Sequence, residues 1–178
     1  MCKNESVMRS ATLVTMEEYL TTDYSPDCDY VDGHIEEHTL GEQPHSGLQR
    51  EFIVYLHSRR KKWGIEIWPE QRVQTTATRF RIPDVCVTIG EPDEPIFRTA
   101  PFLCIEILSS EDRMTRVEKR LQEYLDMGVR FVWVVNPVSR AAWIYSGAGK
   151  QAVTDGLLRT SDPDILVPLD ELFAGARD

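Results

Sequence analysis

The chain has no long, uninterrupted apolar segment. Nowhere in its 178 residues is there an apolar run of about eighteen residues, the length that a membrane-spanning helix needs. The first residues, MCKNESVMRS, lack the apolar core of a secretory signal. We therefore expect a cytoplasmic protein that makes no contact with a membrane.

Paired cysteine motifs are also missing. The cysteines at positions 2, 28, 86 and 104 are far apart, and none belongs to a C-x-x-C pair. This spacing argues against a zinc ribbon and against a disulfide framework. Cys86 and Cys104 lie within apolar runs, so we expect reduced, buried thiols.

Positive charge is scarce, with 20 basic against 29 acidic residues and a net charge of −9. A uniformly acidic protein would repel nucleic acid. The charge is uneven, however: residues 11–45 contain nine carboxylates and no lysine or arginine, whereas residues 57–81 contain seven basic residues. A further basic group lies between Arg113 and Arg120. The Arg59–Lys62 run could bind along a phosphate backbone or form a solvated helix end. The charge distribution therefore leaves open the possibility of an anionic substrate.

The pattern of apolar residues predicts one α/β domain over residues 1–178, with a flexible segment of about ten residues at the N-terminus. Thr15 and Glu18 form a capping box, and Asp32-Gly33 indicates a hairpin. Helices are expected over 45–63 and 115–127 and a short one over 169–173; strands over 65–68, 71–75, 79–82, 84–89, 102–108, 129–135 and 142–145. This order predicts a mixed β-sheet flanked by helices.

Two acids stand out against apolar surroundings. Asp84 opens an apolar strand, and Glu106 interrupts another. An ionised carboxylate in such a strand is costly unless it is paired, hydrogen-bonded or bound to a metal. Two acids on neighbouring strands could share a Mg²⁺ ion, which would polarise a phosphoryl oxygen and activate water. A structural role, such as capping a turn, is the alternative.

Several short segments strengthen the first interpretation. Pro83-Asp84 followed by Glu106 resembles the PD-(D/E)XK nuclease superfamily, and residues 15–145 are more closely similar to its Uma-type restriction endonuclease family. The resemblance implies a restriction-endonuclease-like core and metal-dependent phosphodiester cleavage. The supporting segments are Met16–Leu20, Tyr30–Gly33, His45, Arg81–Val85, Glu106–Ser110, Tyr124–Val129 and Val132–Pro137.

The resemblance also implies site residues. Asp84, Glu106 and the main-chain carbonyl of Ile107 would bind Mg²⁺, for which Mn²⁺ could substitute. Glu37 is preferred over Glu36 as an auxiliary acid because it shares a strand face with Ile35. His45 matches a family position, where it would orient water or phosphate or simply cap a helix. Glu70 and Gln71 are expected nearby.

One position departs from the superfamily pattern. The lysine expected two residues after Glu106 is Leu108 here. A lysine that the family places on the following helix corresponds to Arg120, with Lys119 beside it. Arg120 flanks the apolar stripe and can turn inward, whereas Lys119 lies nearly opposite that stripe. Arginine stabilises a charged phosphorane but does not readily act as a base.

The hypothesis is a Mg²⁺-dependent endonuclease that acts on nucleic acid, with DNA the favoured assignment over RNA, and that forms a homodimer if it cuts both strands of a duplex. One alternative is an inactive member of the same fold that binds nucleic acid or a protein. Another is a structural or oligomerising domain without any role in nucleic-acid binding.

Overall fold

The computed structural model describes residues 13–37, 42–110 and 112–176. Cys2, His38 and the N-terminal segment that we expect to be flexible lie outside these ranges. The other three cysteines are free and buried. No helix in the described ranges is long and apolar enough to cross a membrane.

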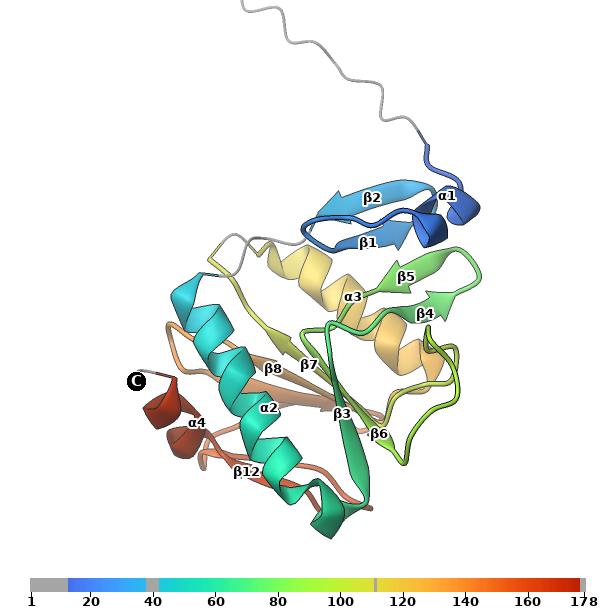
Figure 1. Ribbon diagram of the computed structural model, residues 1–178. Coiled ribbons are helices and arrows are strands. Elements are labelled where there is room, and N and C mark those ends of the chain that lie inside the picture. The colour runs from blue at the N-terminus through green and yellow to red at the C-terminus, as the bar shows by residue number, and fades with distance from the viewer. Residues whose placement is uncertain (1–12, 38–41, 111, 177–178) are drawn as a thin grey trace, which may run out of the picture.

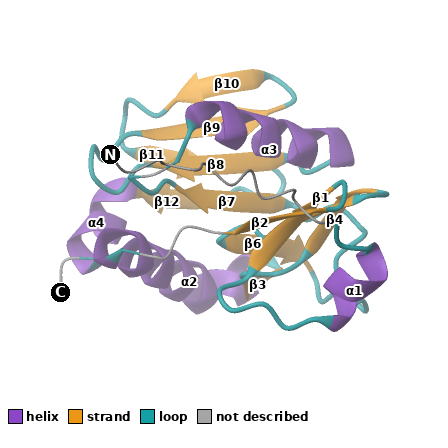
Figure 2. Cartoon of the chain, turned by 90° about the horizontal axis from the view of Figure 1, so that it is seen from above, coloured by secondary structure: helices purple, strands orange, loops and turns teal. Residues whose placement is uncertain are grey.

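A six-stranded mixed sheet forms the centre of the molecule. Its neighbouring strands are antiparallel except for β7 and β8, which run parallel. The strand order from β10 to β7 can be followed in Figure 2. In order across the sheet the strands are β10 (Gly149–Ala152), β9 (Ala142–Ser146), β8 (Phe131–Val135), β7 (Leu103–Ile107), β6 (Val85–Ile89) and β3 (Ile65–Pro69).

Helices cover both faces of this sheet. Leu48, Phe52 and Leu56 of α2 (Gln43–Trp63) pack on one face, together with α4 (Leu169–Gly175). The apolar stripe of α3 (Met114–Met127) packs on the other face. The mixed sheet flanked by helices is therefore confirmed, and the buried strands are near-continuous apolar runs because both faces are covered.

A smaller four-stranded sheet lies at one end of the molecule, beside α1 (Figure 1). Its strand order is β2 (His34–Glu37), β1 (Cys28–Val31), β5 (Arg79–Arg81) and β4 (Val73–Thr76). Asp32 and Gly33 both have positive φ values, 50° and 93°, as the predicted primed turn requires. Tyr19 of α1 (Met16–Thr21) closes the face of this sheet with Tyr30 and Phe80.

The predicted helices agree with the structure within about two residues at each end. The Thr15 hydroxyl accepts a hydrogen bond from the Glu18 amide at 3.1 Å, and Gly64 and Gly128 end α2 and α3 in the left-handed conformation. The sequence pattern did not predict three short strands: β10, β11 (Leu157–Arg159) and β12 (Leu166–Pro168). All four residues of β10 are exposed, so no apolar alternation marks that strand.

Candidate functional site

Strand register places Asp84 and Glu106 opposite each other. β6 and β7 pair Cys86 with Cys104 and Val85 with Ile105, and extending this register by one residue, to the position just before β6, sets Asp84 opposite Glu106. Residues opposed in this way share one face of a sheet. Cys104 packs against α3, so Glu106, two residues farther along β7, is directed toward that helix. Both acids line one cavity of about 470 Å³.

The Asp84 carboxylate is held by two partners. Its Oδ2 accepts a hydrogen bond from the Ile107 amide at 2.6 Å, and its Oδ1 lies 3.2 Å from His45 Nε2. The main-chain carbonyl of Asp84 accepts a further bond from Gln49 at 3.0 Å, and Gln49 also donates to Glu70. Asp84 is therefore positioned by its neighbour strand and by α2.

Glu106 is 2% exposed and is neutralised by α3. Its Oε2 lies 2.7 Å from Arg120 Nη2, and its Oε1 accepts a hydrogen bond from the Tyr124 hydroxyl at 2.8 Å. Burial, reinforced by the charge of Glu106, raises the pKa of Tyr124 well above its ordinary value, so the phenol remains a donor. Burial alone would lower the pKa of Arg120, but the charge of Glu106 and smaller contributions from other nearby groups together outweigh it, so the pKa is raised.

His45 lies in the first turn of α2, against Asp84. Burial pulls its pKa down, but the hydrogen bond to Asp84 and the charge of that carboxylate raise it above its ordinary value. Its Nδ1 is buried and has no hydrogen-bond partner among the described residues. The same is true of Ser109 Oγ and Arg120 Nε, which line the same cavity. Three residues that line the cavity thus each carry one buried polar atom without a hydrogen-bond partner among the described residues.

The cavity is acidic. Eight carboxylates and four arginines line it, so negative charge predominates there, and a bound cation would favour the approach of a phosphate group. The described ranges contain no group of three or more histidine, cysteine, aspartate or glutamate side chains that could hold a metal ion. Two carboxylates, with water and substrate oxygens completing the shell, are the ligand set that Mg²⁺ commonly uses. The donor chemistry of Asp84 and Glu106 fits that ion, and each of their four carboxylate oxygens already contacts a protein group.

Comparison with known proteins adds a family to this geometry. The model of the Uma2 family, described as "Putative restriction endonuclease", matches residues 16–172. The chain belongs to the Uma2 family. A solved structure of "a putative nuclease belonging to DUF820" from Anabaena variabilis is 23% identical, with a TM-score of 0.77, over 92% of this chain and 99% of that one. That similarity supports the shared fold. The search of curated proteins found no match.

The family resemblance placed an auxiliary acid on the early hairpin, and we preferred Glu37. In this Uma2 member Glu37 lines the cavity and is exposed, whereas Glu36 Oε2 accepts a hydrogen bond from Arg81 at 2.9 Å. Glu36 is paired in register with Asp29, so both acids lie on the face that meets Arg81. Of the two acids, Glu36 is therefore the one that pairs with Arg81 at the edge of the cavity.

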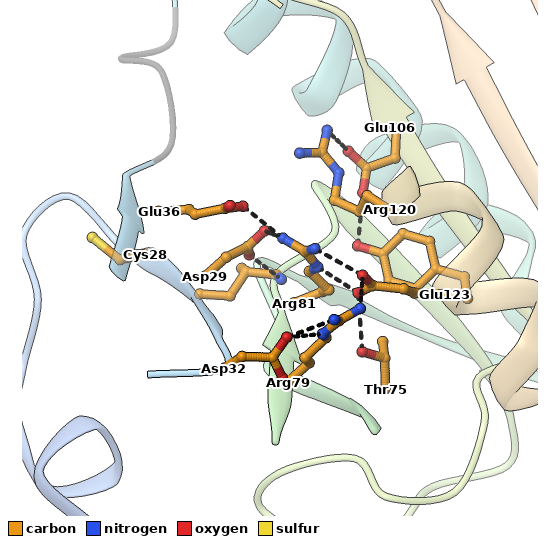
Figure 3. Close-up of polar contacts among 12 residues, drawn as sticks. Cys28, Asp29, Asp32, Glu36, Thr75, Arg79, Arg81, Glu106, Arg120 and Glu123 are labelled. Carbon is orange, nitrogen blue, oxygen red and sulfur yellow. Dashed lines mark hydrogen bonds and ion pairs between the residues drawn. The ribbon is translucent and has the colours of Figure 1, made fainter. Parts of the chain in front are cut away.

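A buried ion-pair network, which sequence reasoning missed, borders the cavity (Figure 3). Arg81 donates to Asp29 at 3.0 Å and to both carboxylate oxygens of Glu123 at 2.8 and 3.0 Å. Arg79 joins Glu123 to Asp32. Glu123 lies on α3, one turn beyond Arg120, so the network fixes α3 against the small sheet. The sequence signal for this network was the pair Arg79 and Arg81, which lie on one face of a short strand and need acidic partners if that face is buried.

The structure distinguishes the two candidate basic residues on α3. Arg120 reaches Glu106, whereas the neighbouring Lys119 is exposed and does not line the cavity. Leu108 is buried in the core beneath α3, so no cation occupies that position. Gln71, expected near the site, is not among the cavity-lining residues, whereas Glu70 is.

Proposed function

We propose that this chain is a metal-dependent endonuclease that hydrolyses phosphodiester bonds in DNA. The observation that carries the proposal is the pair of acids, Asp84 just before β6 and Glu106 on the neighbouring β7, which line one cavity together with Arg120. Membership of a restriction endonuclease family agrees with it.

Asp84, Glu106 and the carbonyl of Ile107 would hold the ion. When bound, Mg²⁺ or Mn²⁺ would polarise a phosphoryl oxygen and lower the pKa of a water molecule. Arg120 neutralises Glu106 and would stabilise the negative charge that develops on the phosphoryl oxygens. Its guanidinium stays protonated, so it donates hydrogen bonds and does not accept the proton of the attacking water.

Cleavage of a labelled DNA in Mg²⁺ tests the proposal. We expect the wild type to cut, and Asp84→Asn to lose metal-dependent cleavage, because a neutral amide binds the ion poorly. Asp164→Asn is the matched control, because Asp164 is exposed and lies outside the cavity lining. Cleavage that survives Asp84→Asn would contradict the mechanism.

A second candidate function is DNA binding without cleavage. Two observations favour it: Arg120 already neutralises Glu106, and Leu108 replaces the lysine of the superfamily pattern. Calorimetric titration with Mn²⁺ separates the candidates. An endonuclease should bind the ion and lose that binding in Asp84→Asn, whereas a binding module should retain salt-sensitive DNA binding and bind no ion.

We further propose that the chain works in the cytoplasm as a homodimer, since cutting both strands of a duplex needs two sites. Sedimentation of the wild type with and without DNA measures the assembly.

A further inference from the structure

Helix α3 carries three arginines along one side of the cavity. Arg113, at the N-cap of the helix, Arg116 and Arg120 are three and four residues apart, so their side chains succeed one another on one face. All three line the cavity that holds Asp84 and Glu106. The arginines therefore lead from the rim of the cavity to its buried acid pair.

The three arginines differ in how they are paired. Arg120 is held by Glu106 at 2.7 Å. Arg113 and Arg116 are exposed, and within the described ranges neither forms an ion pair. Asp112, the sequence neighbour of Arg113, is engaged in the preceding loop, where its Oδ2 accepts a hydrogen bond from the Ser109 amide at 2.7 Å. Two cations at the rim are thus available to an anion.

Helix geometry sets the spacing of these charges. At a rise of 1.5 Å per residue, Arg116 lies about 6 Å from Arg120 along the axis and Arg113 about 4.5 Å farther. Each interval is about one to two nucleotide steps of a strand, taken as 3.4 Å along the duplex axis. Because arginine side chains are long and flexible, they can make up the difference between the helix intervals and whole nucleotide steps. The positive end of the helix dipole lies at the Arg113 end and adds to the attraction.

The other basic cluster is less suited to this role. Lys61 and Lys62 are at the end of α2 that is remote from His45, about 24 Å away at the same rise per residue. Their neighbours are already engaged: Arg60 pairs with Glu66, and Arg59 lies over the Tyr55 ring. None of the four lines the cavity.

We propose that Arg113 and Arg116 bind the phosphates next to the scissile one, so that the strand to be cut runs along α3 from Arg120 toward Arg113. This inference rests on the proposed nuclease function and adds to it the residues that position the strand. Arg113 and Arg116 are positioning residues, because they contact neither the acids nor the bond that breaks.

Salt-dependent DNA binding tests the inference. The parent is Asp84→Asn without added metal, so that the probe, a short fluorescein-labelled DNA duplex, stays intact. Fluorescence anisotropy gives the slope of log K against log salt. Arg113→Gln/Arg116→Gln should weaken binding and make that slope shallower by about 0.9 for each phosphate that the protein no longer neutralises. Arg113→Lys/Arg116→Lys should retain most of the slope, because it keeps both charges.

Lys61→Gln/Lys62→Gln is the matched control, since it removes the same charge from the remote end of α2. It should leave the slope unchanged. An unchanged slope in the arginine double variant, or an equal loss in the lysine double variant, would overturn the inference while leaving the nuclease proposal intact. A parent that binds no duplex, together with a wild type that cuts none, would instead overturn the proposed function itself. Thermal unfolding of each variant verifies that it is folded.

Discussion

Glu106 depends on Arg120 for its place inside the protein. A buried carboxylate that loses its cationic partner retains its desolvation cost, and breaking such a pair typically costs about 3–5 kcal/mol. Tyr124 would still donate its hydrogen bond to Glu106 but carries no positive charge. The pair is therefore important for stability whether or not it is important for catalysis.

Arg120→Gln should lower the free energy of unfolding by about 3–5 kcal/mol, measured by urea denaturation. Arg120→Lys should cost less, because it keeps the charge and loses only the fork geometry. Lys119→Gln is the matched control on the same turn, and an exposed substitution should stay within about 0.5 kcal/mol. Equal losses at positions 119 and 120 would refute the role of the Glu106–Arg120 pair.

Helix α3 is the element that joins the two sheets. One of its faces packs on the large sheet, while Glu123 binds Arg79 and Arg81 of the small sheet. The same helix carries Arg120, so the network at Glu123 also sets the position of the arginine beside Glu106. Loosening Glu123 should disturb both stability and the site.

Glu123→Gln should cost about 1.5–3 kcal/mol at neutral pH, the usual range for hydrogen bonds to a charged group. The effect should depend on pH. Burial raises the pKa of Glu123, but the hydrogen bonds and charges of Arg81 and Arg79 together outweigh burial. The pKa therefore lies below its ordinary value of 4.5. A lowered pKa gives stability that is present above pH 4.5 and is lost as the pH falls through the lowered value.

Urea denaturation between pH 7 and pH 3 would measure this effect. The difference between wild type and Glu123→Gln should shrink as the pH falls, because the wild-type carboxyl becomes neutral as well. Thr75, which faces Glu123 from β4, does not titrate in this range. Glu118→Gln, on the exposed side of α3, should show no such convergence. A difference independent of pH would contradict the assignment.

For the molecule as a whole, charge limits what can bind. The net charge is −9, and carboxylates outnumber arginines among the cavity-lining residues. A DNA substrate therefore requires local positive charge, which α3 and a divalent cation would supply together. Binding of the cation to the folded chain alone would also stabilise the whole fold.

Mg²⁺ should accordingly raise the melting temperature of the wild type. At a concentration one hundred times Kd, the gain is about 2.7 kcal/mol, which for a chain of this size corresponds to about 5–10 °C. Asp84→Asn should show a much smaller shift in the same scanning calorimetry experiment. An equal shift in both proteins would place the ion elsewhere.

The sequence by itself determined the helices, the hairpin turn and the strands of the sheet centre, because caps, glycine stops and apolar periodicity act over a few residues. It also singled out Asp84 and Glu106, since a charge in an apolar strand is visible without any knowledge of its neighbours. Only the tertiary structure decided that Glu36 rather than Glu37 meets Arg81, and that Arg81, Asp29 and Glu123 share one network. Those contacts join strands and a helix far apart in the chain, and strand register and helix docking, which local patterns do not encode, bring them together.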